Sequence, residues 1–67
     1  MTVKYKRGRI ENWISMTRLE VRIWNLLSEE SLESREIVRR LPGVDFFDIV
    51  NSIQNMRRKG ELVGVYD

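Results

Sequence analysis

The sequence predicts a mainly α-helical fold with a small β element, and three observations lead to this fold class. Apolar residues recur at helical spacing in three separate stretches between residues 17 and 59. A break at Pro42 separates the second stretch from the third. After Gly60 the pattern changes to a short strand-like run over residues 61–66, in which Glu61 precedes mainly apolar residues. With 67 residues, the chain has room for one domain and one core.

Composition limits the classes of function. Apolar residues make up 42% of the chain, which is typical of a folded domain. Cysteine and histidine are both absent, so the sequence lacks thiolate ligands for zinc and the commonest general base. No apolar run approaches the roughly 20 residues of a membrane span, and no signal peptide is visible. We therefore expect a cytoplasmic protein, associated with the nucleoid if the source is a prokaryote.

Residues 1–16 are predicted to form a basic N-terminal arm with a short strand and a helical turn. Residues 2–6 alternate as in a strand, and Ile10, Trp13 and Ile14 have the spacing of one helical turn. The first nine residues hold four cations, whereas the remainder carries eight basic and ten acidic side chains. A mobile cationic arm on a near-neutral body suits contact with phosphates. The alternative is that the charge only keeps the protein soluble.

The first clear helix is predicted to begin after Thr17 and to end near Glu29. Thr17 and Glu20 have the spacing of a capping box, in which each side chain bonds the other residue's backbone amide. One apolar face of this helix is formed by Leu19, Ile23, Leu26 and Leu27.

A second apolar strip on the first helix consists of Val21 and Trp24. Two alternatives account for it. Either Ile10, Trp13 and Ile14 fold back over the strip, or the strip is a contact with another subunit. The candidates for a dimer or partner contact are Trp13, Val21 and Trp24.

The second helix is predicted to begin at the N-cap Ser34 and to stop before Pro42 and Gly43. Its inward side is formed by Ile37, Val38 and Leu41. Its outward side and flank carry Arg35, Arg39 and Arg40.

The third helix is predicted to have Asp45 as its N-cap and to run from Phe46 to about Lys59. One stripe is apolar and is expected to pack on the first two helices: Phe46, Ile49, Val50, Ile53 and Met56. The opposite stripe holds Phe47, Asn51, Gln54, Asn55 and Arg58. Asn and Gln can bond bidentately to adenine and Arg to guanine, and Phe47 can press on a thymine methyl. The alternative is a solvated face, with Phe47 tucked under the turn.

From Thr17 to Tyr66 the pattern resembles the winged helix-turn-helix superfamily of small DNA-binding regulators of bacteria, archaea and phages. The resemblance is carried by Leu19, Ile23 and Leu27 and by residues 34–38, 42–44 and 53–63. It implies a three-helix helix-turn-helix core over residues 17–67 with a short or truncated wing, because only one strand follows the third helix. Either residues 2–6 pair with residues 62–66 in place of the returning strand, or the wing is absent.

The resemblance implies a DNA-binding transcriptional regulator that places the helix 45–59 in the major groove. The expected partners are double-stranded DNA and a second copy of the chain, since one small module gives limited specificity. The candidates for base contact are Phe47, Asn51, Gln54, Asn55 and Arg58. The candidates for phosphate contact are Lys4, Lys6, Arg7, Arg9, Arg35, Arg39, Arg57 and Lys59. Asp45 and Asp48 place negative charge at the start of this helix, where carboxylates repel phosphates. Either they are caps turned away from DNA, or Asp48 accepts from a cytosine amine.

The alternative function is a winged-helix protein-interaction module that does not read DNA, with Phe47, Trp24 or Trp13 as the anchor. Enzyme activity is not expected. The sequence has no glycine-rich phosphate loop, no metal-ligand spacing and no nucleophile paired with a histidine. No cofactor, metal, small-molecule ligand or membrane is expected as a partner.

Overall fold

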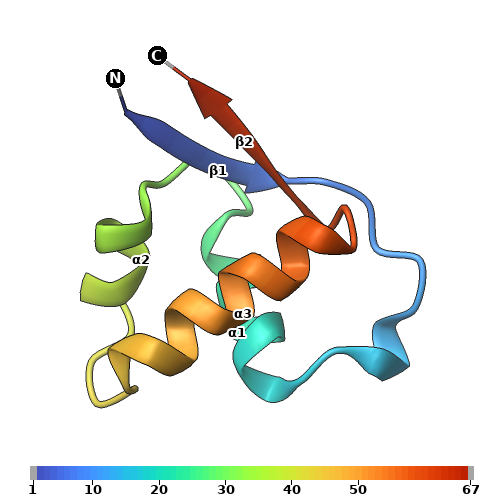
Figure 1. Cartoon of the computed structure of the whole chain (residues 1–67), viewed down its shortest axis with the longest axis horizontal. Helices are drawn as coiled ribbons and strands as arrows, with labels where there is room; N and C mark the ends of the chain where they lie inside the picture. Colours follow the sequence, from blue (N-terminus) through green and yellow to red (C-terminus); the bar gives the residue numbers. More distant parts are fainter. Residues whose placement is uncertain (1, 67) are drawn as a thin grey trace.

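The computed structural model describes residues 2–66 as a small α+β fold (Figure 1). A two-stranded antiparallel sheet lies over three α-helices, and its strands β1 and β2 lie side by side at the top of the view. The elements follow in the order β1 (Val3–Arg7), the 3-10 helix η1 (Trp13–Ser15), α1 (Arg18–Leu26), α2 (Ser34–Arg39), α3 (Phe46–Arg58) and β2 (Leu62–Tyr66).

The sheet joins the beginning of the chain to its end. Val3 lies opposite Tyr66, and Arg7 lies opposite Leu62. On the other side of β1, the amide of Tyr5 donates to the carbonyl of Leu32 at 2.7 Å, and the carbonyl of Tyr5 accepts from the amide of Leu32 at 3.0 Å. Of the two alternatives for the wing, the pairing of the first segment with the last strand is therefore confirmed. The predicted mobile arm is wrong over residues 3–7, because their backbone pairs with β2 and is also bonded to Leu32 at Tyr5.

Local capping sets where the helices begin. The amide of Thr17 donates to Glu20 Oε1 at 2.9 Å and the amide of Glu20 donates to Thr17 Oγ1 at 3.1 Å, so the predicted capping box is confirmed. Asp45 caps α3 as predicted, with its Oδ1 accepting from the amide of Phe47 at 2.7 Å. The prediction for Ser34 is wrong by one residue. Glu33 is the N-cap of α2, because the bridge at Leu32 keeps the chain extended up to that point.

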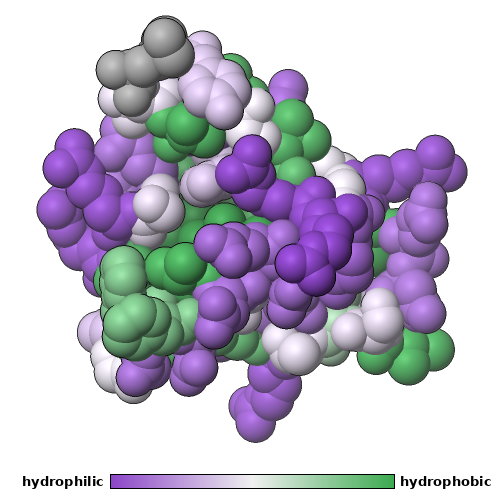
Figure 2. Space-filling model, in the orientation of Figure 1, coloured by the Kyte–Doolittle hydropathy of each residue, from purple (hydrophilic) through white to green (hydrophobic). Residues whose placement is uncertain are grey.

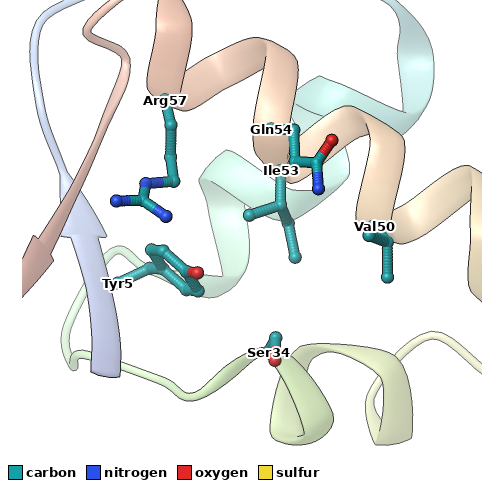
Figure 3. Close-up of a pocket in the computed structure, with 6 residues that line it drawn as sticks. All are labelled: Tyr5, Ser34, Val50, Ile53, Gln54 and Arg57. Carbon is teal, nitrogen blue, oxygen red and sulfur yellow. The ribbon is translucent and has the colours of Figure 1, made fainter. Parts of the chain in front are cut away.

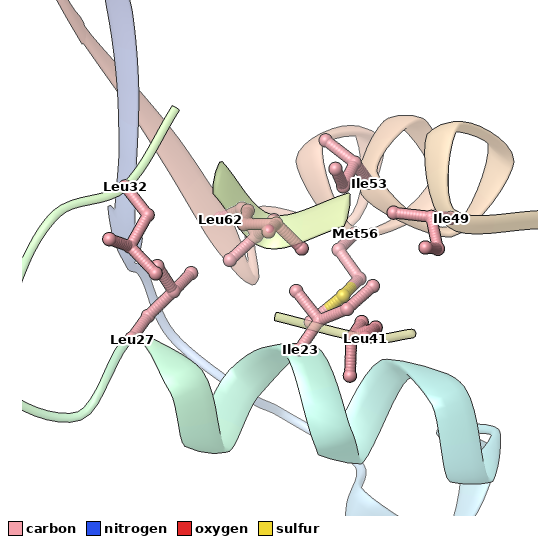
Figure 4. Packing of buried hydrophobic residues seen from close by; sticks show 9 residues of the cluster. Ile23, Leu27, Leu32, Leu41, Ile49, Ile53, Met56 and Leu62 are labelled. Atoms are coloured by element: carbon pink, nitrogen blue, oxygen red, sulfur yellow. The ribbon is translucent and has the colours of Figure 1, made fainter. Parts of the chain in front are cut away.

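The core lies between the sheet and the three helices (Figure 4). Its buried side chains come from the three α-helices, from the segments that connect them and from β2: Ile23, Leu27, Leu32, Ile37, Leu41, Ile49, Ile53, Met56 and Leu62. The predicted inward stripe of α3 is confirmed at Ile49, Ile53 and Met56. It is wrong at Phe46, which is 55% exposed. Phe46 is the first residue of α3, and its ring packs on the Phe47 ring instead of on another helix.

A glycine allows the sharp passage from α3 into β2. Gly60 has a φ of 79°, a conformation that side chains disfavour. It lets the amide of Glu61 donate back to the carbonyl of Met56 at 2.8 Å, which closes the helix in a Schellman turn. Gly8 packs against this turn so closely that an added Cβ would lie 2.2 Å from the Gly60 carbonyl oxygen. The end of β1 and the end of α3 therefore fit together only through a residue without a side chain.

Candidate nucleic-acid interface

One side of α3 is exposed over the whole length of the helix. At thirteen residues, the helix is roughly 20 Å long. The predicted base-contact residues are all exposed on it: Phe47, Asn51, Gln54, Asn55 and Arg58. The opposite side is fixed in the core by Ile49, Ile53 and Met56. The amide groups are therefore presented on a rigid element whose rotation is set by the core.

The start of α3 differs from its second half. The Phe46 and Phe47 rings lie 5.7 Å apart in an edge-to-face arrangement, and Phe47 is 72% exposed. The alternative that Phe47 tucks under the turn is therefore wrong. Asp45 and Asp48 are exposed beside these rings. This end of the helix is apolar and negative, whereas the second half is polar and ends in two arginines.

A hollow of about 130 Å³ flanks α3 on the side of β1 and α2 (Figure 3). The Arg57 guanidinium lies 5.4 Å from the centre of the Tyr5 ring at one end of it. Gln54 borders the hollow and also belongs to the exposed amide face. Tyr5 and Ser34 also line the hollow, although neither was predicted to belong to the interface. The alternation of residues 2–6 could have indicated the position of Tyr5, because it places Tyr5 on the same side of the strand as Val3 and Arg7.

Two of the predicted phosphate contacts are occupied inside the protein. The Lys59 Nζ lies 3.3 Å from Glu20 Oε2 and 3.5 Å from Glu61 Oε1. Both carboxylates are only 3% exposed, so Lys59 supplies their compensating charge. At 3.5 Å the contact with Glu61 is an ion pair without a good hydrogen bond, and Glu61 Oε1 has no hydrogen-bond donor among the described residues.

Arg7 has a similar internal role. Its Nε donates to the carbonyl of Trp24 at 3.0 Å, and its guanidinium lies 4.7 Å from the centre of the Trp24 ring. A cation in this position holds β1 to the end of α1. Neither Arg7 nor Lys59 is therefore well placed to leave the protein for a phosphate.

Apart from Arg18 and Arg22 on α1, the other cations lie in three places. Arg35, Arg39 and Arg40, with Glu36, line an open hollow of about 390 Å³ on α2. Arg35 and Arg40 also form ion pairs, at 2.9 Å to Glu33 and 2.7 Å to Glu30. A second group, at the end of α3, consists of Arg57 and Arg58. Figure 2 shows hydrophilic residues over α2 and over the second half of α3 on one face of the molecule.

The remaining predicted phosphate contacts belong to the N-terminal segment. Lys4 and Lys6 lie opposite Val65 and Val63, on the face of the sheet that points away from the core. Arg9 is exposed just after β1. Lys4 and Lys6 are therefore fixed on the sheet, and Arg9 lies beside it. These three cations belong to a different element from the cations of α2 and α3.

The aromatic strip on α1 is partly covered by η1. The Trp13 and Trp24 rings lie 5.7 Å apart and are nearly perpendicular. The fold-back alternative is thus confirmed for Trp13 and wrong for Ile14, which is 95% exposed. Val21 is half-buried. The exposed apolar residues beside this strip are therefore Trp13 and Ile14 of η1.

Among the described residues, no helix combines the length and the apolar character needed to cross a membrane, and no group of three or more acidic side chains could hold a metal ion. Comparison with models of protein families, with curated proteins and with solved structures finds no match for this chain. What the chain binds is therefore inferred from the geometry of its own side chains.

Proposed function

We propose that this chain is a DNA-binding domain of the winged helix-turn-helix type, in which α2 and α3 form the helix-turn-helix unit and α3 enters the major groove. The observation that carries the proposal is the exposed stripe Asn51, Gln54, Asn55 and Arg58, which lies opposite a buried stripe of the same helix. Carboxamides and a guanidinium on one rigid face are the groups that bond bidentately to adenine and guanine.

The contact with the groove is centred on the second half of α3. Asp45 and Asp48 repel phosphates, so the start of the helix is turned toward the edge of the interface. Asn51 and Gln54 then lie over the base edges, and Arg58 follows one turn later. The phosphate contacts are assigned to Arg39 on α2 and to Arg57 at the end of α3, because both are exposed on the elements that flank this face.

In this proposal β1 takes the place of the returning strand of the wing. It pairs with β2 along one edge and, at Tyr5, with Leu32 at the other. The contacts assigned in this proposal therefore come from the two helices.

The proposal is tested by selecting bound fragments from a random duplex pool and measuring fluorescence anisotropy at two salt concentrations. We expect affinity to fall steeply as salt rises. Asn51→Ala and Gln54→Ala are expected to reduce discrimination between selected and random duplexes by about 1–3 kcal/mol each. Asn25→Ala removes an exposed carboxamide from α1 and is the matched control. Equal losses on selected and random DNA would contradict base reading by α3.

The second candidate function is a protein-interaction module, and the exposed Phe46 and Phe47 pair favours it. Two neighbouring aromatic rings beside two carboxylates fit a partner with an apolar pocket and a basic rim. This candidate predicts little binding to DNA at any salt concentration, and a partner complex that is lost in Phe47→Ala but kept in Asn51→Ala.

A further inference from the structure

The outer edge of β2 is open and carries none of the usual protections of a sheet edge. The sheet order is β1–β2, so no described strand pairs with β2 on its far side. From Leu62 to Tyr66 the strand has no charged residue and no proline. Native proteins usually block such an edge with a lysine, a proline, a bulge or a covering loop. An open, apolar edge therefore indicates a site for another strand.

The register shows which backbone groups of β2 face outward. The amide and carbonyl of Tyr5 bond to Leu32, so they point away from Gly64, the residue opposite Tyr5. Tyr5 and Gly64 are thus a non-hydrogen-bonded pair, and Gly64 directs its own amide and carbonyl to the open edge. The bond from the amide of Gly8 to the carbonyl of Glu61 at 2.7 Å fixes the same alternation independently. Leu62, Gly64 and Tyr66 therefore present unpaired backbone groups.

The edge is self-complementary about Gly64. When two copies of β2 run antiparallel with Gly64 opposite Gly64, Leu62 lies opposite Tyr66 of the other copy. Each outward amide then meets an outward carbonyl. On the face away from the core, Val63 lies opposite Val65 of the other copy. Both valines are exposed in one copy, and apolar β-branched pairs stabilise a sheet.

The helices leave room for this arrangement. Because α3 joins β2 at the Leu62 end, the two copies bring their α3 ends to opposite ends of the joined strands. Those ends are separated by four residues, or roughly 13 Å along the sheet. The free edge of β1 is met by Leu32, so pairing through β2 uses the remaining open edge and assembly stops at two copies.

We propose that this protein forms a homodimer through antiparallel pairing of β2 with β2 of a second copy about a two-fold axis at Gly64. The contact uses the open edge of β2 and not the exposed stripe Asn51, Gln54, Asn55 and Arg58 of α3.

Sedimentation of the whole chain over a range of concentrations tests the proposal with a matched pair of variants. Val63→Glu/Val65→Glu places like charges opposite each other across the axis, while each acid lies beside Lys6 or Lys4 of its own copy. We expect the dimer dissociation constant to rise by at least about tenfold. Val63→Glu/Val65→Lys changes the same positions but places opposite charges across the axis, and this variant is expected to remain dimeric.

Amide hydrogen exchange followed by NMR gives a second readout. The amides of Leu62, Gly64 and Tyr66 are expected to gain protection as concentration rises, whereas those of Val63 and Val65 are bonded to β1 in either state and change little. Circular dichroism of both double variants confirms that they are folded.

Several results would overturn the proposal. These are a monomer at every concentration, an open-ended polymer, and equal sedimentation of the two double variants. A dimer that is broken by Ile14→Glu on η1 but not by Val63→Glu/Val65→Glu would place the contact on the aromatic strip instead.

Discussion

Arg7 lies over the ring of Trp24, with its guanidinium 4.7 Å from the ring centre and its Nε bonded to the Trp24 carbonyl at 3.0 Å. One side chain thus satisfies a carbonyl at the end of α1 and covers an aromatic face. This contact fixes the end of β1 to the first helix. One of the four cations of the N-terminal segment is therefore used inside the protein.

Replacing Arg7 by alanine is expected to lower the free energy of unfolding by about 1–2 kcal/mol, because the hydrogen bond and the ring contact are both lost. Urea unfolding measures the change. Arg9→Ala removes an exposed arginine two residues later and is expected to stay within about 0.5 kcal/mol of the original protein. Equal effects of the two substitutions would argue against a specific contact.

Ile53→Ala is expected to cost about 2–5 kcal/mol, since Ile53 is buried between α3 and its neighbours and the change leaves a cavity. Thermal and urea unfolding both report this loss. Gln54→Ala, at the next and exposed position, serves as the control for helix propensity. An unchanged unfolding midpoint for Ile53→Ala would show that the rotation of α3 is wrong.

Gly8→Ala is expected to destabilise the protein by about 1–3 kcal/mol, because the new Cβ would meet the backbone of the Gly60 turn.

Gly43 provides a contrast to Gly8. It has open space around it but a φ of 84°, so Gly43→Asn is expected to cost less than Gly43→Ala. Measured by urea unfolding, a harmless Gly8→Ala would mean that β1 does not approach α3 as closely as described.

Lys59→Met leaves Glu20 and Glu61 buried beside each other's charge without a cation, and it is expected to destabilise the protein by about 1–3 kcal/mol. Adding Glu61→Gln removes one of the two charges and is expected to recover part of this loss. A double-mutant cycle on unfolding free energies measures the coupling. Additive effects of the two substitutions would show that Lys59 and Glu61 do not interact.

Arg39→Ala is expected to weaken binding to selected and random duplexes alike and to reduce the salt slope by about 1, because it removes one phosphate contact. Arg22→Ala removes an exposed arginine from α1 and is the matched control. If both substitutions lower the slope equally, the effect comes from net charge and the assigned contact is absent.

Local features of the fold could be predicted from sequence. The Thr17 capping box, the Asp45 cap and the inward position of Ile53 depend on residues a few positions apart, and the structure confirms them. The alternation around Tyr5 likewise allowed the pairing with β2 as one of two choices. The sequence could not decide between them, because that choice depends on a partner at the other end of the chain.

The errors have a common physical cause. Phe46 has the right helical phase to face the core, but periodicity does not show where the neighbouring helices end. Lys59 and Arg7 were assigned to phosphates on charge alone, and their internal partners come from distant parts of the chain. The exposed amide stripe of α3 agrees with its predicted position, and its role in binding remains a proposal.

The pairing of Val3 with Tyr66 also has a consequence for how this protein is made. The helices can form from local contacts while synthesis is under way, but the sheet needs a strand from each end of the chain. The last step of folding must therefore wait until Tyr66 has emerged from the ribosome, and long-range closure of this kind is slow compared with helix formation. In a nascent chain that lacks β2, Tyr5 would have no strand opposite it, and the core cluster that contains Leu32 would lack Leu62.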